Sequence, residues 1–173
     1  RTIGQLAHTD PAFLRSHLKK HGEVLYEYAN GRDGSSVLSE EPDSKVCGNS
    51  VTTSHDVTDS GEARRILLSL CENVCSRLRS AGRRGFCVTV QFTDSDFQNH
   101  SHQRTFSSAT DVTEEVYSIA CGLFDALWDG SPIRLLGVSV SRLTETAQRQ
   151  YNLFDRDKYE KLNRLDQAID QIR

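Results

Sequence analysis

An alternating stretch in the second half of the chain constrains the fold more than any other feature. From Gly85 to Thr93, the apolar residues Phe86, Val88, Val90 and Phe92 alternate with polar or small ones. This period of two predicts a strand with one buried face and one polar face. The run at 102–107 is β-branched, aromatic and rich in hydroxyls, and it predicts a second strand beside the first. We therefore expect a polar sheet surface.

The flanking sequence supplies two more strands and two helices. A β-branched run at 45–57, with a possible kink at Gly48, predicts the first strand. Residues 60–81 and about 110–128 carry apolar residues at helical spacing, with Ser60 and either Thr110 or Asp111 as expected N-caps. Residues 132–141 predict the last strand. The order βαββαβ predicts an α+β domain, a four-stranded sheet with both helices on one face.

The remaining sequence divides into three parts. Residues 1–31 predict short helices, one capped by Asp10 and ended by Gly22, and these are too few to bury a core alone. The polar, aperiodic stretch 32–44 predicts a linker before the main domain at 45–143. The tail at 144–173 predicts an amphipathic helix from Asp157 onward. Because the chain contains no Met and opens on Arg1, we expect it to be a piece of a longer protein.

The charge balance limits how this chain could bind nucleic acid. It has 21 Lys and Arg against 24 Asp and Glu, a net charge of −3, and no segment is a basic block. Any binding to phosphates must therefore come from the placement of side chains, and it would be weak and sensitive to salt. The arginines of the 60–81 helix, Arg64, Arg65, Arg77 and Arg79, are interpreted as a solvated helix face.

No metal site or membrane segment is expected. Cys71 and Cys75 lie one helical turn apart, but no second ligand pair follows, so the five cysteines are interpreted as small hydrophobic residues in a reducing cytosol. Asp94 and Asp96 stand beside turn formers without a third carboxylate. No apolar run approaches the ~18 residues that span a bilayer, which predicts a soluble protein.

Two surfaces remain as candidates for function. If the helices cover one sheet face, the other face presents hydroxyls and amides, and such groups can donate hydrogen bonds to phosphate oxygens without reading bases. An ordinary solvated sheet face is an equal alternative. In the tail, Leu153 and Phe154 form a small apolar island. This island is typical of an anchor for another protein's pocket, although it could also fold back on the domain. The open sheet face would consist of Thr89, Gln91, Thr105, Gln103 or Arg104, and Ser139 or Ser141.

Several segments together resemble a known family, namely 1–7, 45–50, 93–97, 104–106, 134–143 and 150–154. With these segments, the chain resembles the C-terminal part of bacterial Y-family translesion DNA polymerases of the DNA polymerase IV type, namely the end of the thumb, the little finger domain and a clamp-binding tail. The tail motif has Tyr151 where the family usually has Leu, and the linker is acidic where the family's is often basic.

The resemblance implies a non-catalytic DNA-binding fragment of a cytoplasmic lesion-bypass polymerase. The catalytic carboxylates with their two magnesium ions would lie in an absent palm domain, so this chain alone should be inactive. The competing hypothesis is a ferredoxin-like protein-interaction or regulatory module that does not bind DNA. The residues expected to contact the backbone of primer-template duplex DNA are Lys45, Gly48, Asn49, Ser50, Thr52, Gln103, Arg104 and Thr105. Those expected to bind the sliding clamp are Gln150, Tyr151, Leu153 and Phe154.

Overall fold

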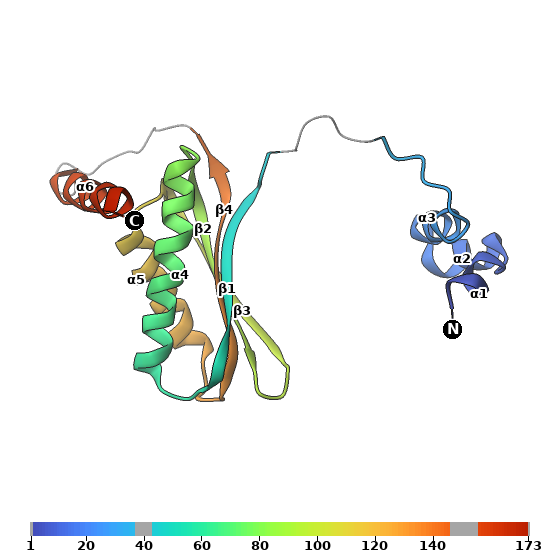
Figure 1. The fold of residues 1–173 in the computed structure, drawn as a ribbon, viewed down its shortest axis with the longest axis horizontal. Coiled ribbons are helices and arrows are strands. Elements are labelled where there is room, and N and C mark those ends of the chain that lie inside the picture. The colour runs from blue at the N-terminus through green and yellow to red at the C-terminus, as the bar shows by residue number, and fades with distance from the viewer. Residues whose placement is uncertain (1, 37–42, 146–155, 173) are drawn as a thin grey trace. The chain divides into compact units, whose positions relative to one another are not determined.

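The computed structural model describes residues 2–36, 43–145 and 156–172. The chain divides into two compact units, residues 1–42 and 43–173. Figure 1 shows three short helices in the first unit, and a sheet with its helices in the second.

The first unit consists of α1 (Ile3–Ala7), α2 (Pro11–Leu18) and α3 (Lys20–Ala29). As predicted, Asp10 caps α2, because its carboxylate accepts a hydrogen bond from the backbone N–H of Ala12. The prediction that Gly22 ends a helix is wrong. The break lies at Lys19, which has a φ of 54°, and Gly22 lies inside α3. A side chain at Gly22 would overlap the backbone of Leu14, so a glycine is needed here for the close contact of α2 with α3.

The second unit has the predicted βαββαβ order. Its elements are β1 (Val46–Val57), α4 (Ser60–Ser80), β2 (Arg84–Asp94), β3 (Asn99–Thr110), α5 (Thr113–Leu127) and β4 (Ile133–Thr144), followed by α6 (Arg156–Ile172). The strands pair antiparallel in the order β1-β4-β2-β3. The expected kink at Gly48 is absent, since this residue pairs in register with Ser139, and the irregularity of β1 falls between Thr52 and Val57.

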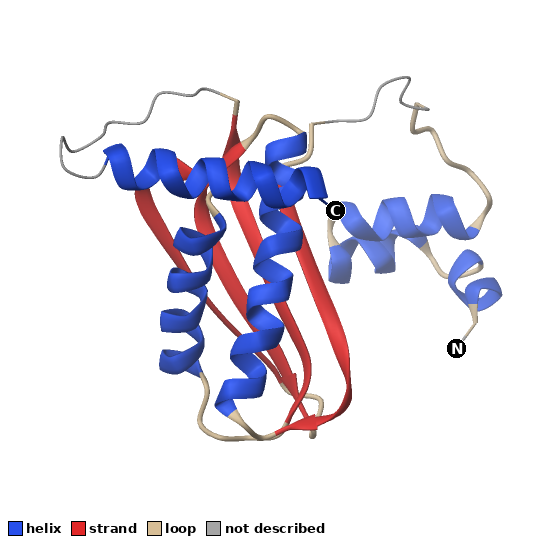
Figure 2. Cartoon of the chain, turned by 60° about the vertical axis from the view of Figure 1, so that its left-hand side comes forward, coloured by secondary structure: helices blue, strands red, loops and turns tan. Residues whose placement is uncertain are grey.

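Both α4 and α5 lie on one face of the sheet, as the α+β prediction requires (Figure 2). The buried side chains of both helices pack on the inward side chains of the strands, including Val88, Val90, Phe92, Leu136 and Val138. Burial of this continuous apolar layer is the main stabilising contribution to the domain. Among the described residues of the second unit, no helix covers the opposite face of the sheet, which is called the open face.

Two expected helix caps differ from the structure. The N-cap of α4 is Asp59, whose carboxylate accepts from the backbone N–H of Glu62, and Ser60 is the first helical residue. The N-cap of α5 is Val112, which has no side chain that could cap it. Thr110 lies two residues before this N-cap, and its hydroxyl accepts from the N–H of Val112.

Candidate nucleic-acid interface

The open face of the sheet is built by residues that pair across all four strands. Paired residues of adjacent strands point to the same side of a sheet, so the register assigns each side chain to a face. Because Val88, Val90 and Phe92 are buried under the helices, the residues between them point to the open face. The open-face rows, in the order β1, β4, β2, β3, are Val46-Ser141-Cys87-Thr105, Gly48-Ser139-Thr89-Gln103, Ser50-Gly137-Gln91-Ser101 and Thr52-Leu135-Thr93-Asn99.

None of the residues in these rows carries a charge. Hydroxyls and amides dominate, and most are exposed or half-buried, with Gly137 and Cys87 as the buried exceptions. The hydroxyl of Thr93 donates to the side-chain oxygen of Asn99 at 2.7 Å, so one hydrogen bond within the surface joins β2 to β3 at this end. Such a surface can donate and accept hydrogen bonds, but it attracts polyanions only weakly from a distance.

Five of the eight residues expected to contact DNA lie on this face. Gly48, Ser50 and Thr52 are on β1, while Gln103 and Thr105 are on β3. Since β1 and β3 are the two edge strands, the expected contacts form two separate groups. The strip between them belongs to β4 and β2.

The other three expected residues lie elsewhere. Lys45 is exposed and precedes β1. Asn49 pairs with the buried Val138, so it points to the helix side, where its side-chain oxygen accepts from the N–H of Ser50. Arg104 pairs with the buried Val88 and therefore also points to the helix side of β3.

The helix side of β3 carries basic and titratable groups. Arg104 and His102 are both exposed there. Further along, His100 stacks on Phe92 with ring centroids 4.7 Å apart, and its Nε2 lies 2.9 Å from the carboxylate of Asp94. The hydrogen bond from His100 and that from the N–H of Gln98 hold the pKa of Asp94 below its usual range. Asp94 thus fixes the β2–β3 hairpin.

Sequence reasoning missed two features at the borders of this surface. Arg142 follows Ser141 on β4, is exposed, and has a φ of 55°, which is rare for a residue other than glycine. At the hairpin tip, Phe97 also has a positive φ of 61°, and the guanidinium of Arg134 lies 4.8 Å from its ring centroid. The sequence segments that resemble the family include Phe97, Arg134 and Arg142. No pattern in the sequence, however, indicates the positive φ of Phe97 and Arg142.

Two cysteines of the helix layer, Cys71 and Cys75, are buried. Burial raises the pKa of Cys71 to about 12, and it also raises the pKa of Cys75. Cys121 is half-buried, and all five cysteines are free thiols. Over residues 2–36, 43–145 and 156–172, no group of three His, Cys, Asp or Glu side chains could hold a metal ion. Nor is any helix in those ranges long and apolar enough to cross a membrane.

The prediction that the arginines of α4 form a solvated face is wrong for Arg79. Its side chain is only 10% exposed and pairs with Asp166 and Asp170 of α6. Arg77 donates to the backbone carbonyl of Gly48 at 3.0 Å. The expected clamp-binding residues Gln150, Tyr151, Leu153 and Phe154 lie outside the described residues.

Comparison with known proteins gives the family. Residues 44–153 match the impB/mucB/samB family C-terminal domain. The chain therefore belongs to this family, and it corresponds to the C-terminal part of the Y-family polymerases of the DNA polymerase IV type, as the sequence motifs indicated.

Individual relatives agree with this assignment. The chain is 37% identical over 173 residues to DNA polymerase IV of Clostridium acetobutylicum, a match that covers the whole chain and 44% of the relative. It is 32% identical over 183 residues to DNA polymerase IV of Clostridium kluyveri, covering 100% of the chain and 46% of the relative. It is 35% identical over 177 residues to DNA polymerase IV 2 of Bacillus subtilis, a match that covers 99% of the chain and 42% of the relative. The chain thus spans less than half the length of each of these relatives.

Proposed function

We propose that the second unit binds the sugar-phosphate backbone of duplex DNA as the little finger domain of a lesion-bypass polymerase. The observation that carries this proposal is the open sheet face, an ordered surface of hydroxyls and amides that spans all four strands. Groups of this kind donate to phosphate oxygens and carry no information on base sequence. Binding would therefore be independent of sequence.

Charge for this binding would come from the edges of the sheet. Lys45 beside β1 and Arg104 on β3 are exposed cations at opposite edges. A duplex lying across the open face would meet neutral donors in the middle and a cation at each border. With so few cations, we expect a salt dependence that corresponds to only a few phosphate contacts.

The tail would hold the polymerase at the replication site. We propose that Gln150, Tyr151, Leu153 and Phe154 bind the bacterial sliding clamp as a short anchor with apolar contacts. Catalysis, with its magnesium ions, would belong to other parts of a DNA polymerase IV. The parent enzyme would act in the cytoplasm, where bacterial DNA is replicated.

Titration of a fluorescent primer-template duplex with the 173-residue chain tests the DNA proposal. At low salt we expect saturable binding that weakens at moderate salt and does not depend on the base sequence of the duplex. A chain that leaves the duplex unbound at low salt would instead support an interaction module that does not bind DNA. The neutral charge of the open face is the feature that would favour that second function.

A further inference from the structure

The C-terminal helix α6 lies across one end of the helix layer. Figure 2 shows it crossing above α4 and α5, and its contacts lie at the C-terminal end of α4 and the N-terminal end of α5. Residues 44–153 carry the family match, so α6, which begins at Arg156, lies outside the matched domain. The family match therefore says nothing about the role of α6.

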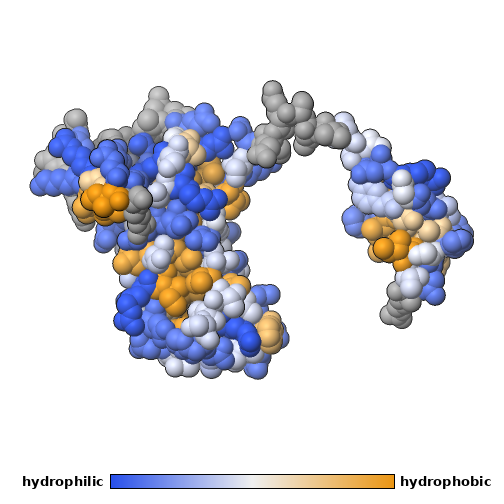
Figure 3. Space-filling model, in the orientation of Figure 1, coloured by the Kyte–Doolittle hydropathy of each residue, from blue (hydrophilic) through white to orange (hydrophobic). Residues whose placement is uncertain are grey.

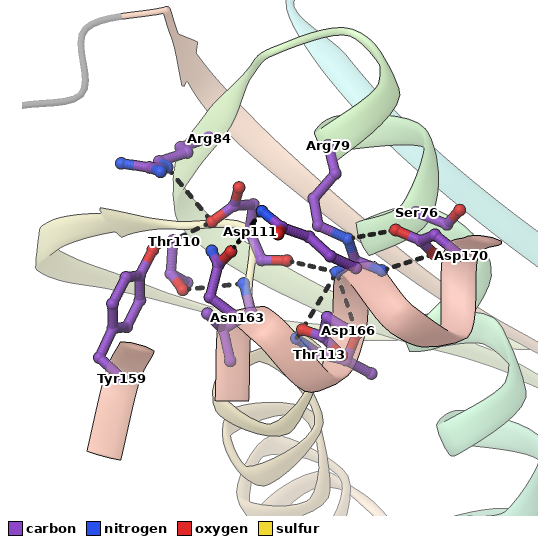
Figure 4. Close-up of polar contacts among 12 residues, drawn as sticks. Ser76, Arg79, Arg84, Thr110, Asp111, Thr113, Tyr159, Asn163, Asp166 and Asp170 are labelled. Atoms are coloured by element: carbon purple, nitrogen blue, oxygen red, sulfur yellow. Dashed lines mark hydrogen bonds and ion pairs between the residues drawn. The ribbon is translucent and has the colours of Figure 1, made fainter. Parts of the chain in front are cut away.

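One largely buried arginine of α4, Arg79, binds α6. The guanidinium of Arg79 binds Asp170 through two nitrogens, with Nε to Oδ2 at 2.6 Å and Nη2 to Oδ1 at 2.9 Å. Its Nη1 lies 3.1 Å from Asp166 Oδ2 and donates to the backbone carbonyl of Asp111 at 2.9 Å (Figure 4). Asp166 and Asp170 are one helical turn apart, so a single cation binds one face of α6.

The carboxylate of Asp166 also caps the N-terminus of α5. Because the N-cap Val112 offers no side-chain acceptor, the first N–H groups of α5 need another partner. Asp166 Oδ2 accepts from the N–H of Thr113 at 2.9 Å. A carboxylate at a helix N-terminus is favoured by the helix dipole. Asp166 therefore caps a helix that begins 53 residues earlier in the chain.

A second polar contact, made by Tyr159, lies near the N-terminal end of α6. The hydroxyl of Tyr159 donates to Asp111 Oδ1 at 3.2 Å, and Arg84 Nε lies 3.2 Å from the same oxygen. Figure 4 shows both groups meeting Asp111 beside the Arg79 cluster. Hydrogen bonds and ion pairs thus bind α6 to the domain near both of its ends.

Apolar packing between α6 and the domain is incomplete. Leu165 is 56% exposed and Ile172 is 86% exposed, and a cavity of about 150 Å³ separates α6 from α4 and α5, lined in part by Leu68, Leu162 and Ile169. The contiguous hydrophobic core draws on the sheet, α4 and α5; among the described residues of α6, Tyr159 is buried but lies outside this cluster. In Figure 3 the surface over α6 is hydrophilic except for a hydrophobic patch near the C-terminus. The core therefore does not depend on α6.

We propose that the surface around Arg79 and the N-terminus of α5 is a docking site for an amphipathic helix that carries two aspartates one turn apart, which α6 occupies and from which α6 can detach without unfolding the domain. The site selects two carboxylates one turn apart, one for Arg79 and one shared with the N–H of Thr113. Apolar residues beside them, such as Leu162 and Ile169, line the cavity together with Leu68. A helix with this pattern from another protein would compete with α6.

Hydrogen exchange of the full chain tests whether α6 detaches separately. In the double variant Asp166→Asn, Asp170→Asn, we expect amide exchange in α6 to rise at least about tenfold, because a buried arginine loses both carboxylates. Exchange in β2 and β4 should stay as in the wild type. The matched control is Asp125→Asn, which removes the ion pair of Arg64 between α4 and α5 and should leave α6 unchanged. Unchanged α6 exchange in the double variant, or an equal rise in the sheet, would overturn the proposal.

A peptide tests the chemistry of the site. A labelled peptide of residues 156–173 should bind the double variant saturably, and it should bind the wild-type chain at least about tenfold more weakly, since α6 already occupies the site there. The same peptide with asparagine at both aspartate positions should bind neither chain. Equal binding of the two peptides, or no binding of the wild-type peptide to the double variant, would contradict a carboxylate-selective docking site.

Discussion

Gln103 and Arg104 are neighbours in the chain but lie on opposite faces of the sheet. Gln103 pairs with Thr89 on the open face, whereas Arg104 pairs with the buried Val88 and points to the helix side. Both are exposed at the edge strand β3. The two side chains therefore allow the neutral face and the cationic edge to be tested separately.

Arg104→Ala should weaken duplex binding equally for all base sequences and reduce the salt slope by about one phosphate contact. The physical reason is the loss of one edge cation. Gln103→Ala should weaken binding at every salt concentration and leave the slope as it is, because an amide releases no counterions. Fluorescence titrations from low to moderate salt measure both effects. An unchanged slope in Arg104→Ala would show that this residue does not contact phosphate.

The β2–β3 hairpin should lose stability in acid through Asp94. The pKa of Asp94 is lowered in the folded state, chiefly by its hydrogen bond with His100 and also by that with the N–H of Gln98. A lowered folded pKa stabilises the fold above the unfolded pKa of about 3.9, and this contribution disappears as the pH falls through the folded value. The difference in unfolding free energy between the wild type and Asp94→Asn should therefore be full at pH 6 and shrink below pH 4. Urea unfolding across this range measures it, and a difference independent of pH would contradict the pairing.

Two glycines of the second unit should respond oppositely to alanine. At Gly85 a Cβ would overlap the side chain of Val140 and lie 3.0 Å from the carbonyl of Ser141. Gly85→Ala should cost about 1–3 kcal/mol of unfolding free energy by overpacking. Gly122 lies on the exposed side of α5, and a Cβ there would meet nothing within 4 Å. Gly122→Ala should stabilise by up to about 1 kcal/mol. Denaturant unfolding compares the two variants, and a stabilised Gly85→Ala would contradict the register of β2 with β4.

The clamp proposal predicts a specific loss of affinity. Replacing both Leu153 and Phe154 with Ala should abolish measurable binding to the bacterial sliding clamp, because apolar anchor residues dominate such peptide contacts. DNA binding should be unaffected. Phe97→Ala, which removes an aromatic side chain 67% exposed on the domain, is the matched control and should retain clamp affinity. Surface plasmon resonance on immobilised clamp distinguishes the outcomes, and intact affinity in the double variant would refute the tail anchor.

The alternation at 85–93 predicted the strand β2, because the burial of one sheet face leaves a period of two in the sequence, and β-branched runs together with helical spacing predicted the rest of the βαββαβ order. The sequence pattern could not show whether Gln103 or Arg104 lies on the open face. The face of each residue depends on its cross-strand partner, which is Thr89 for Gln103 and Val88 for Arg104. Register is set by side chains that meet across the sheet, and no short-range pattern records it.

Long-range partners explain the other differences from the sequence predictions. In the sequence alone, Arg79 cannot be told from a solvated helix arginine. Its partner Asp170 lies 91 residues later, in α6, which covers Arg79 in the structure. The N-cap of α5 was expected at Thr110 or Asp111, yet the acceptor for Thr113 comes from Asp166. Capping rules assume a local partner, and here tertiary contact supplies it.

The most direct test of DNA binding by the open face compares two variants of equal net charge. Gln91→Glu adds one carboxylate to the open face, and Asn73→Asp adds one to the exposed side of α4. At low salt, primer-template titration should show about fivefold weaker binding for Gln91→Glu, roughly 1 kcal/mol of repulsion from a nearby phosphate, and near wild-type binding for Asn73→Asp. Equal affinities of the two variants would contradict DNA binding on the open face.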